Sequence, residues 1–193
     1  LLTDNFAVLK TVCRNISTQP IRNVATVGGN LTCRYTWTEM PAVMIGMDAT
    51  LHFLDKARNE TTMPAEDFFK AQAKTDKIFT HVSIKRDKKA SLAYQRVKKT
   101  VNIDIPLLSL MVKTNFEGKE FSHTRVGVNN CVTFAQRDSK LESFLNGKTF
   151  SPSVVEEALQ HLDHTIYDNR SDDYKKHMFN VSIKKALMDL GSN

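Results

Sequence analysis

Two consecutive glycines, Gly28 and Gly29, constrain this chain more than any other pair of residues. Without Cβ atoms they allow positive φ and let another group approach the backbone closely. Successive backbone N–H groups in such a loop can converge on an anion, and Thr26 and Asn30 flank the pair with hydrogen-bonding side chains. The stretch predicts either a diphosphate-binding loop or a tight turn without a ligand. Neither the GxGxxG pattern of a Rossmann loop nor the GxxxxGK(S/T) pattern of a P-loop is present.

Hydrophobic periodicity along the chain predicts an α+β fold in two parts. The first part, residues 1–85, combines helices with strand-like segments, and a charged, turn-like stretch at 86–90 marks the boundary. The second part, residues 86–193, is expected to be a small antiparallel sheet with helices packed on it. Expected helices are 4–16, 38–47, 66–69, 138–145, 151–166 and 172–190, and expected strands are 49–54, 60–63, 78–84, 91–101, 105–113 and 121–128.

Local signals mark several ends of these elements. Ser151 followed by Pro152 predicts a capped helix start, and Asp172 with Asp173 predicts another. Residues 115–118 predict a hairpin turn between the last two strands.

Composition argues against several classes of protein. Hydrophobic residues make up 41% and charged residues 25% of the chain, as in globular proteins rather than disordered ones. No run of about 18 apolar residues occurs, so no membrane-spanning helix is expected. Lys and Arg outnumber Asp and Glu, 27 to 21, but the resulting charge of +6 is dispersed. A nucleic-acid binder concentrates basic residues on one face, so nucleic acid is not an expected partner.

The cysteines and histidines indicate no metal site. Cys13, Cys33 and Cys131 are far apart and form no CxxC motif. We expect free, mostly buried thiols in a reducing compartment, and hence a cytoplasmic protein. His161 and His164 lie three residues apart without an evident third ligand, and we expect them to be exposed.

The string from Gln19 to Leu31, QPIRNVATVGGNL, closely resembles a signature of one family. That family is the FAD-binding (medium) subunits or domains of molybdenum hydroxylases, such as xanthine dehydrogenase and carbon monoxide dehydrogenase. The resemblance covers nearly the whole chain, and the string is its specific part. It implies the second subdomain of a PCMH-type FAD-binding fold, followed by a CO dehydrogenase flavoprotein C-terminal-like domain. The further similar segments are 38–43, 48–51, 64–69, 93–135, 140–147 and 174–187.

The resemblance also implies a set of cofactor-binding residues. Glu39 stands where the family commonly has an Asp that hydrogen-bonds sugar or ribitol hydroxyls. Ile78 or Phe79 would pack near the flavin ring, and Gln95 occupies a site where Lys or Arg often reaches toward the flavin. No residue is expected to act as an acid, a base, a nucleophile or a metal ligand. The residues expected at the FAD diphosphate are Thr26, Val27, Gly28, Gly29 and Asn30.

The function implied by the resemblance is electron transfer. Electrons would pass from iron–sulfur clusters through FAD to NAD⁺ or another acceptor. The molybdenum cofactor and the 2Fe–2S clusters would reside in a large and a small partner subunit. Family members begin with another subdomain that brings a second glycine-rich loop. Nothing in this chain corresponds to it, so the isolated fragment is expected to bind FAD weakly or not at all and to be inactive.

Two other functions stay open. The chain could be a non-catalytic subunit-docking module that has lost flavin binding. It could also be another flavoenzyme of the same fold, such as a relative of the enolpyruvyl-sugar reductases, although its C-terminal half argues against that.

Overall fold

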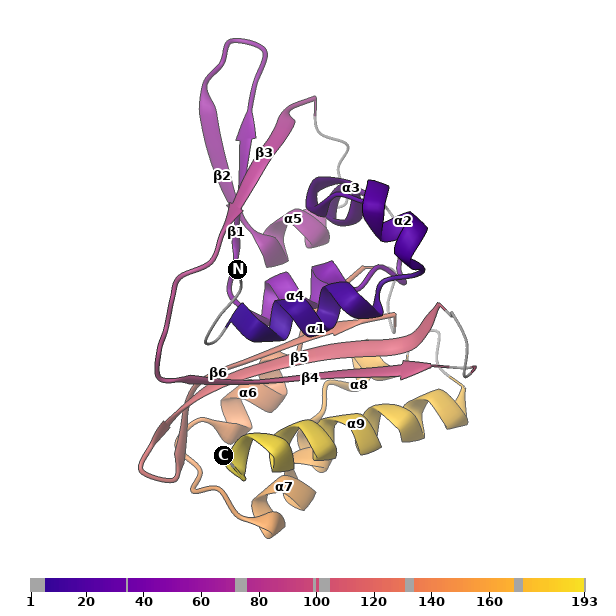
Figure 1. Ribbon diagram of the computed structural model, residues 1–193. Coiled ribbons are helices and arrows are strands. Elements are labelled where there is room, and N and C mark those ends of the chain that lie inside the picture. Colours follow the sequence, from indigo (N-terminus) through magenta and orange to yellow (C-terminus); the bar gives the residue numbers. More distant parts are fainter. Residues whose placement is uncertain are drawn as a thin grey trace.

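The structure is a computed structural model that describes residues 6–33, 35–71, 76–98, 100, 105–130, 134–168 and 172–192. It contains a three-stranded sheet that projects from one end and a four-stranded sheet with helices on both faces (Figure 1). Within the described residues, no helix is both long and apolar enough to cross a membrane. The first half contains α1 (Ala7–Asn15), α2 (Gln19–Val24), α3 (Val27–Thr32), α4 (Met40–Gly46), β1 (Thr50–Leu54), β2 (Glu60–Pro64), α5 (Ala65–Ala71) and β3 (Ile78–Ser83). The second half contains β4 (Ala90–Lys98), β5 (Pro106–Glu117), β6 (Glu120–Asn129), β7 (Gln136–Arg137), α6 (Ser139–Leu145), α7 (Pro152–Ala158), α8 (His164–Tyr167) and α9 (Asp173–Gly191).

Threonine hydroxyls set the starts of helices α2 and α3. Thr18 Oγ1 accepts a hydrogen bond from Ile21 N at 3.3 Å, and Thr26 Oγ1 accepts one from Gly29 N at 2.9 Å. Pro20 lies in the first turn of α2, where its missing N–H would have no helical partner. Each cap satisfies one of the amides that the start of a helix leaves unpaired.

Both sheets are antiparallel. Strand order is β2-β1-β3 in the small sheet and β4-β5-β6-β7 in the larger one. The turn between β5 and β6 holds Gly118 at φ +67, a conformation that glycine adopts without strain. The strands continue past the expected turn at 115–118, because Phe116 pairs with Phe121 and Glu117 with Glu120.

The larger sheet separates two hydrophobic cores. One face packs against α6–α9 around Phe121, Phe179 and Leu187. The other face packs against α1 and α4, and its core includes Met111 of β5. In Figure 1 these helices lie on opposite sides of β4, β5 and β6. The predicted α+β fold is therefore confirmed.

The interior of the molecule brings α4 very close to β6. Every residue of α4 is buried. A Cβ atom at Gly127 would lie 2.1 Å from Ala42 O, and one at Gly46 would lie 2.6 Å from Met111 Cγ. Two glycines thus allow the backbones of helix and sheet to meet.

The predicted helix over 151–166 is wrong in its second half. The capped start at Ser151 is confirmed, but α7 ends at Ala158 and a 3-10 turn follows at Leu159–His161. Asp163 is the N-cap of α8, which starts at His164, and its Oδ1 accepts a hydrogen bond from Thr165 N at 3.1 Å. The predicted cap at Asp172 is also confirmed, since Asp172 Oδ1 accepts from Lys175 N at 2.8 Å.

The expectation of mostly buried thiols is wrong for Cys13. It lies on α1 beside the buried Val12, and its side chain points to solvent while Val12 enters the core. Cys33 is half-buried, and Cys131 lies outside the described residues.

Candidate functional site

The segment Thr26–Asn30 is the beginning of a helix rather than a loop with positive φ. Thr26 is extended (φ −120°, ψ 155°) and caps α3, which starts at Val27. Among the described residues, the glycines with positive φ are Gly118 and Gly147. The expected loop with positive φ at Gly28 and Gly29 is therefore wrong. Because Thr26 Oγ1 takes the Gly29 amide, the amides of Val27 and Gly28 are left without an intrahelical acceptor. The segment therefore still offers backbone donors to an anion, in helical rather than left-handed geometry.

Phe79 lies against this helix start. A Cβ atom at Gly28 would come within 3.2 Å of Phe79 Cδ1, so the ring and the glycine backbone are in close contact. The Phe79 ring also meets Phe53 edge to face, with ring centroids 5.7 Å apart. Its neighbour Ile78 is 70% exposed. The structure thus brings Phe79 to the predicted diphosphate segment and leaves Ile78 at the surface of β3.

Asn30 and Glu39 meet at the start of α4. Asn30 Oδ1 accepts a hydrogen bond from Met40 N at 3.3 Å. Glu39 is buried and forms an ion pair with Arg96 of β4, with Nε and Oε1 3.2 Å apart. Burial raises the pKa of the Glu39 carboxyl, and this effect exceeds the opposing ones of a backbone hydrogen bond and of the Arg96 guanidinium.

A half-open hollow of about 320 Å³ lies beside these two residues. That volume is at the small end of the range for ligand pockets. Its polar wall joins the end of the predicted diphosphate segment to the start of α4. The lining residues are Ile16, Ser17, Asn30, Trp37, Thr38, Glu39, Ile105 and Pro106.

Gln95 lies on the other face of the sheet. Its Nε2 donates a hydrogen bond to Asp189 Oδ2 of α9 at 3.0 Å. Successive side chains on a strand point to opposite faces, so Arg96 faces Glu39 while Gln95 faces α9. The structure does not bring Gln95 to Thr26–Asn30. Arg96 was not among the predicted site residues, although strand alternation could have shown that Arg96 and its neighbour Gln95 cannot share a face.

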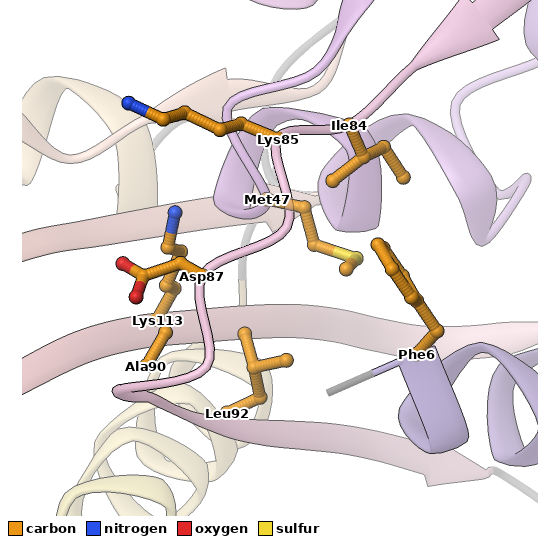
Figure 2. Close-up of a pocket in the computed structure, with 8 residues that line it drawn as sticks. All are labelled: Phe6, Met47, Ile84, Lys85, Asp87, Ala90, Leu92 and Lys113. Carbon is orange, nitrogen blue, oxygen red and sulfur yellow. The ribbon is translucent and has the colours of Figure 1, made fainter. Parts of the chain in front are cut away.

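A second hollow, shown in Figure 2, lies between the start of α1 and the connection from β3 to β4. Its volume is about 10 Å³, which is the room of a single water molecule and too little for a cofactor. Within the described part of the chain, no group of three His, Cys, Asp or Glu side chains could hold a metal ion. The residues lining this hollow are Phe6, Met47, Ile84, Lys85, Asp87, Ala90, Leu92 and Lys113.

Comparison with known protein families accounts for both halves of the chain. Residues 1–85 match the model of the FAD binding domain in molybdopterin dehydrogenase. Residues 92–190, more than half of the chain, match that of the CO dehydrogenase flavoprotein C-terminal domain. The chain belongs to the FAD-binding medium-subunit family of the molybdopterin dehydrogenases. This confirms the family resemblance of the sequence.

Individual members of the family show similar sequences. The carbon monoxide dehydrogenase medium chain of Hydrogenophaga pseudoflava is 26% identical over 190 residues, covering 93% of this chain and 65% of that one. The nicotinate dehydrogenase FAD-subunit of Eubacterium barkeri is 26% identical over 191 residues, covering 91% of this chain and 63% of that one. The chain therefore spans less than two thirds of the length of these relatives.

Solved structures show the same fold. Carbon monoxide dehydrogenase from Hydrogenophaga pseudoflava superposes with a TM-score of 0.83 at 23% identity, covering 93% of this chain and 65% of that one. Carbon monoxide dehydrogenase from Oligotropha carboxidovorans superposes with a TM-score of 0.87 at 18% identity, covering 99% of this chain and 69% of that one.

Proposed function

We propose that this chain is the FAD-binding electron-transfer component of a molybdenum hydroxylase-type dehydrogenase. The observation that carries the proposal is the match of residues 1–85 to an FAD-binding domain, with an exposed helix start at the position of its glycine pair. FAD, when bound, supplies the redox chemistry, and the protein supplies its binding and orientation. No side chain of this chain needs to act as an acid, a base or a nucleophile.

The residues of the helix start fit a dinucleotide diphosphate. Gly28 and Gly29 present no side chain, and Phe79 already fills the space that a Cβ at Gly28 would enter. The amides of Val27 and Gly28 can donate to phosphate oxygens, and Thr26 holds the helix start in place. Charge-assisted hydrogen bonds of this kind are stronger than neutral ones.

The other predicted contact residues are placed differently with respect to this segment. Asn30 and Glu39 line the adjoining hollow, where they can meet a sugar or ribitol hydroxyl. Ile78 lies at the exposed surface beside Phe79, where it can pack on a ring. Gln95 would have to leave Asp189 to reach a cofactor, so we place it outside the binding site.

The partners belong to the same proposal. The names of the relatives include medium chains and an FAD-subunit, which supports assembly with a molybdenum-binding large subunit and an iron–sulfur small subunit. Electrons would then pass from the iron–sulfur clusters through FAD to NAD⁺ or another acceptor. We place the assembly in the cytoplasm, and we divide the chain into domains at residues 85 and 86, close to where the two family matches end and begin.

A docking module without flavin is the second candidate function. It is favoured because two residues predicted to contact the cofactor already interact with other side chains of this chain. Glu39 forms an ion pair with Arg96, and Gln95 donates a hydrogen bond to Asp189. In that case the chain would bind its partner subunits and carry no electrons.

Replacing Thr26 with valine tests the proposed diphosphate site. The substitution keeps the shape but removes the hydroxyl that accepts the Gly29 amide. Loss of a cap costs about 1 kcal/mol of helix stability, and we expect FAD affinity to fall about five-fold as the helix start loosens. The measurement is the dissociation constant of FAD for the native protein, purified with the subunits that accompany it.

Thr18→Val is the matched control, because Thr18 caps α2 in the same way. It should lower stability by a similar amount and leave FAD affinity unchanged. Equal FAD affinity in the wild type and both variants would rule out Thr26–Asn30 as the diphosphate site.

A further inference from the structure

The hollow beside Asn30 has an aromatic rim that the proposed diphosphate site leaves unused. Trp37 and Tyr35 stack with ring centroids 4.6 Å apart and planes 16° from parallel. Tyr35 is 60% exposed and Trp37, the one tryptophan of the chain, is 38% exposed. Large aromatic side chains bury much apolar area in cores and interfaces, so an exposed stacked pair beside a hollow is a candidate contact surface.

The lining of the hollow suits a flat, partly polar ligand. Trp37 supplies an aromatic wall, and Ile16 and Ile105 supply apolar ones. Thr38 and Glu39 line the same hollow and provide polar atoms. Because Glu39 is fixed by Arg96 and Asn30 is fixed by Met40 N, the polar side of the hollow is preorganised.

The size and place of the hollow limit what can occupy it. About 320 Å³ holds one ring system with its sugar rather than a whole dinucleotide. Asn30 belongs both to α3, where the diphosphate is proposed to bind, and to the lining of the hollow. A group attached to that diphosphate would therefore reach the hollow directly.

We propose that Trp37, backed by Tyr35, is the stacking platform for a planar heteroaromatic ring of the bound dinucleotide. The inference rests on the proposed function and adds to it a positioning residue and a ring-binding subsite. The ring is either the isoalloxazine or the adenine of FAD, and both offer an aromatic face of the kind that stacks on tryptophan. Stacking of a base on an aromatic side chain is sequence-tolerant because it needs only that face.

Trp37→Ala and Trp37→Phe test the platform in the native protein with its accompanying subunits. We expect Trp37→Ala to weaken FAD binding about five- to hundred-fold. Trp37→Phe keeps an aromatic face and should retain most of the wild-type affinity. Tyr174→Ala is the matched control, since Tyr174 is also 60% exposed but lies on α9, on the other face of the sheet. It should leave FAD affinity unchanged, and urea unfolding midpoints show whether each variant is folded.

Two half-ligands identify the ring. FMN carries the isoalloxazine and ADP carries the adenine. The half-ligand whose affinity falls with Trp37→Ala is the one that occupies the hollow. The difference in tryptophan emission between the wild type and Trp37→Phe gives a second readout, because emission from the accompanying subunits cancels in it. ADP does not absorb at tryptophan emission wavelengths, so it changes this difference by contact with Trp37.

The outcomes separate this inference from the proposed function. If Thr26→Val weakens FAD binding while Trp37→Ala leaves the affinities for FAD, FMN and ADP unchanged, the platform is wrong and the diphosphate site stands. If the wild-type native protein binds no FAD, the proposed function and the platform both fail.

Discussion

Replacing Gly127 with alanine will destabilise this protein by about 3 kcal/mol or more. Its Cβ would lie 2.1 Å from Ala42 O and 2.7 Å from Gly46 N, both backbone atoms of α4. Backbone atoms cannot rotate away as a side chain can, so helix and sheet must separate. Since every residue of α4 is buried, the shift would disturb the whole core between α4 and β6. Urea unfolding measures the effect as a lower midpoint.

Ser109→Ala is the control for the Gly127 variant, because Ser109 lies on the neighbouring strand β5 opposite Asn129. Its buried hydroxyl has no hydrogen-bond partner among the described residues, so its removal should be neutral or slightly stabilising. A Gly127→Ala midpoint equal to that of Ser109→Ala would contradict the close approach of α4 and β6.

Replacing Arg96 with methionine will cost about 3–5 kcal/mol at neutral pH. The substitution keeps much of the side-chain volume but leaves the Glu39 carboxylate buried without its ion-pair partner. Breaking an exposed pair costs far less, so Lys140→Met, which separates Lys140 from Asp163, should cost about 1 kcal/mol or less. Removing both charges with Arg96→Met and Glu39→Leu together should recover most of the loss, because neither charge of this pair is then left buried without its partner.

The cost of Arg96→Met will depend on pH. Burial already raises the pKa of Glu39, and Arg96 opposes that rise. Without Arg96 the folded-state pKa rises further, so the penalty grows as the pH rises through that value and is smallest below the unfolded-state pKa. Unfolding of the single and double variants at about pH 4 and about pH 8 tests this sign. A penalty of Arg96→Met that is the same at both pH values would contradict a buried ion pair. So would a double variant that is as unstable as Arg96→Met alone.

Local chemistry allowed several elements to be predicted from the sequence. Ser151 and Asp172 are short-range helix caps whose effect depends on residues three positions away, and both occur as expected. Strands β1 and β3 follow from apolar alternation. The family signature placed the candidate site at Thr26–Asn30, and the structure keeps that segment exposed at the surface.

Tertiary contacts decided what the sequence could not show. Two glycines disfavour a helix, yet the Thr26 cap and the contact of Gly28 with Phe79 hold α3 in place. The burial of Glu39 against Arg96 joins residues 57 positions apart, which no local pattern reveals. A lone glycine in a strand, such as Gly127, signals a close approach, but not which segment approaches.

The flavin content of the natural protein, purified from its source with its accompanying subunits, tests the central claim most directly. We expect FAD in equimolar amount with this chain, released on denaturation and identified by absorbance and mass, together with molybdenum and iron–sulfur clusters in the partner subunits. A complex that contains this chain and its partners but no flavin would contradict the assignment and would support the docking module instead.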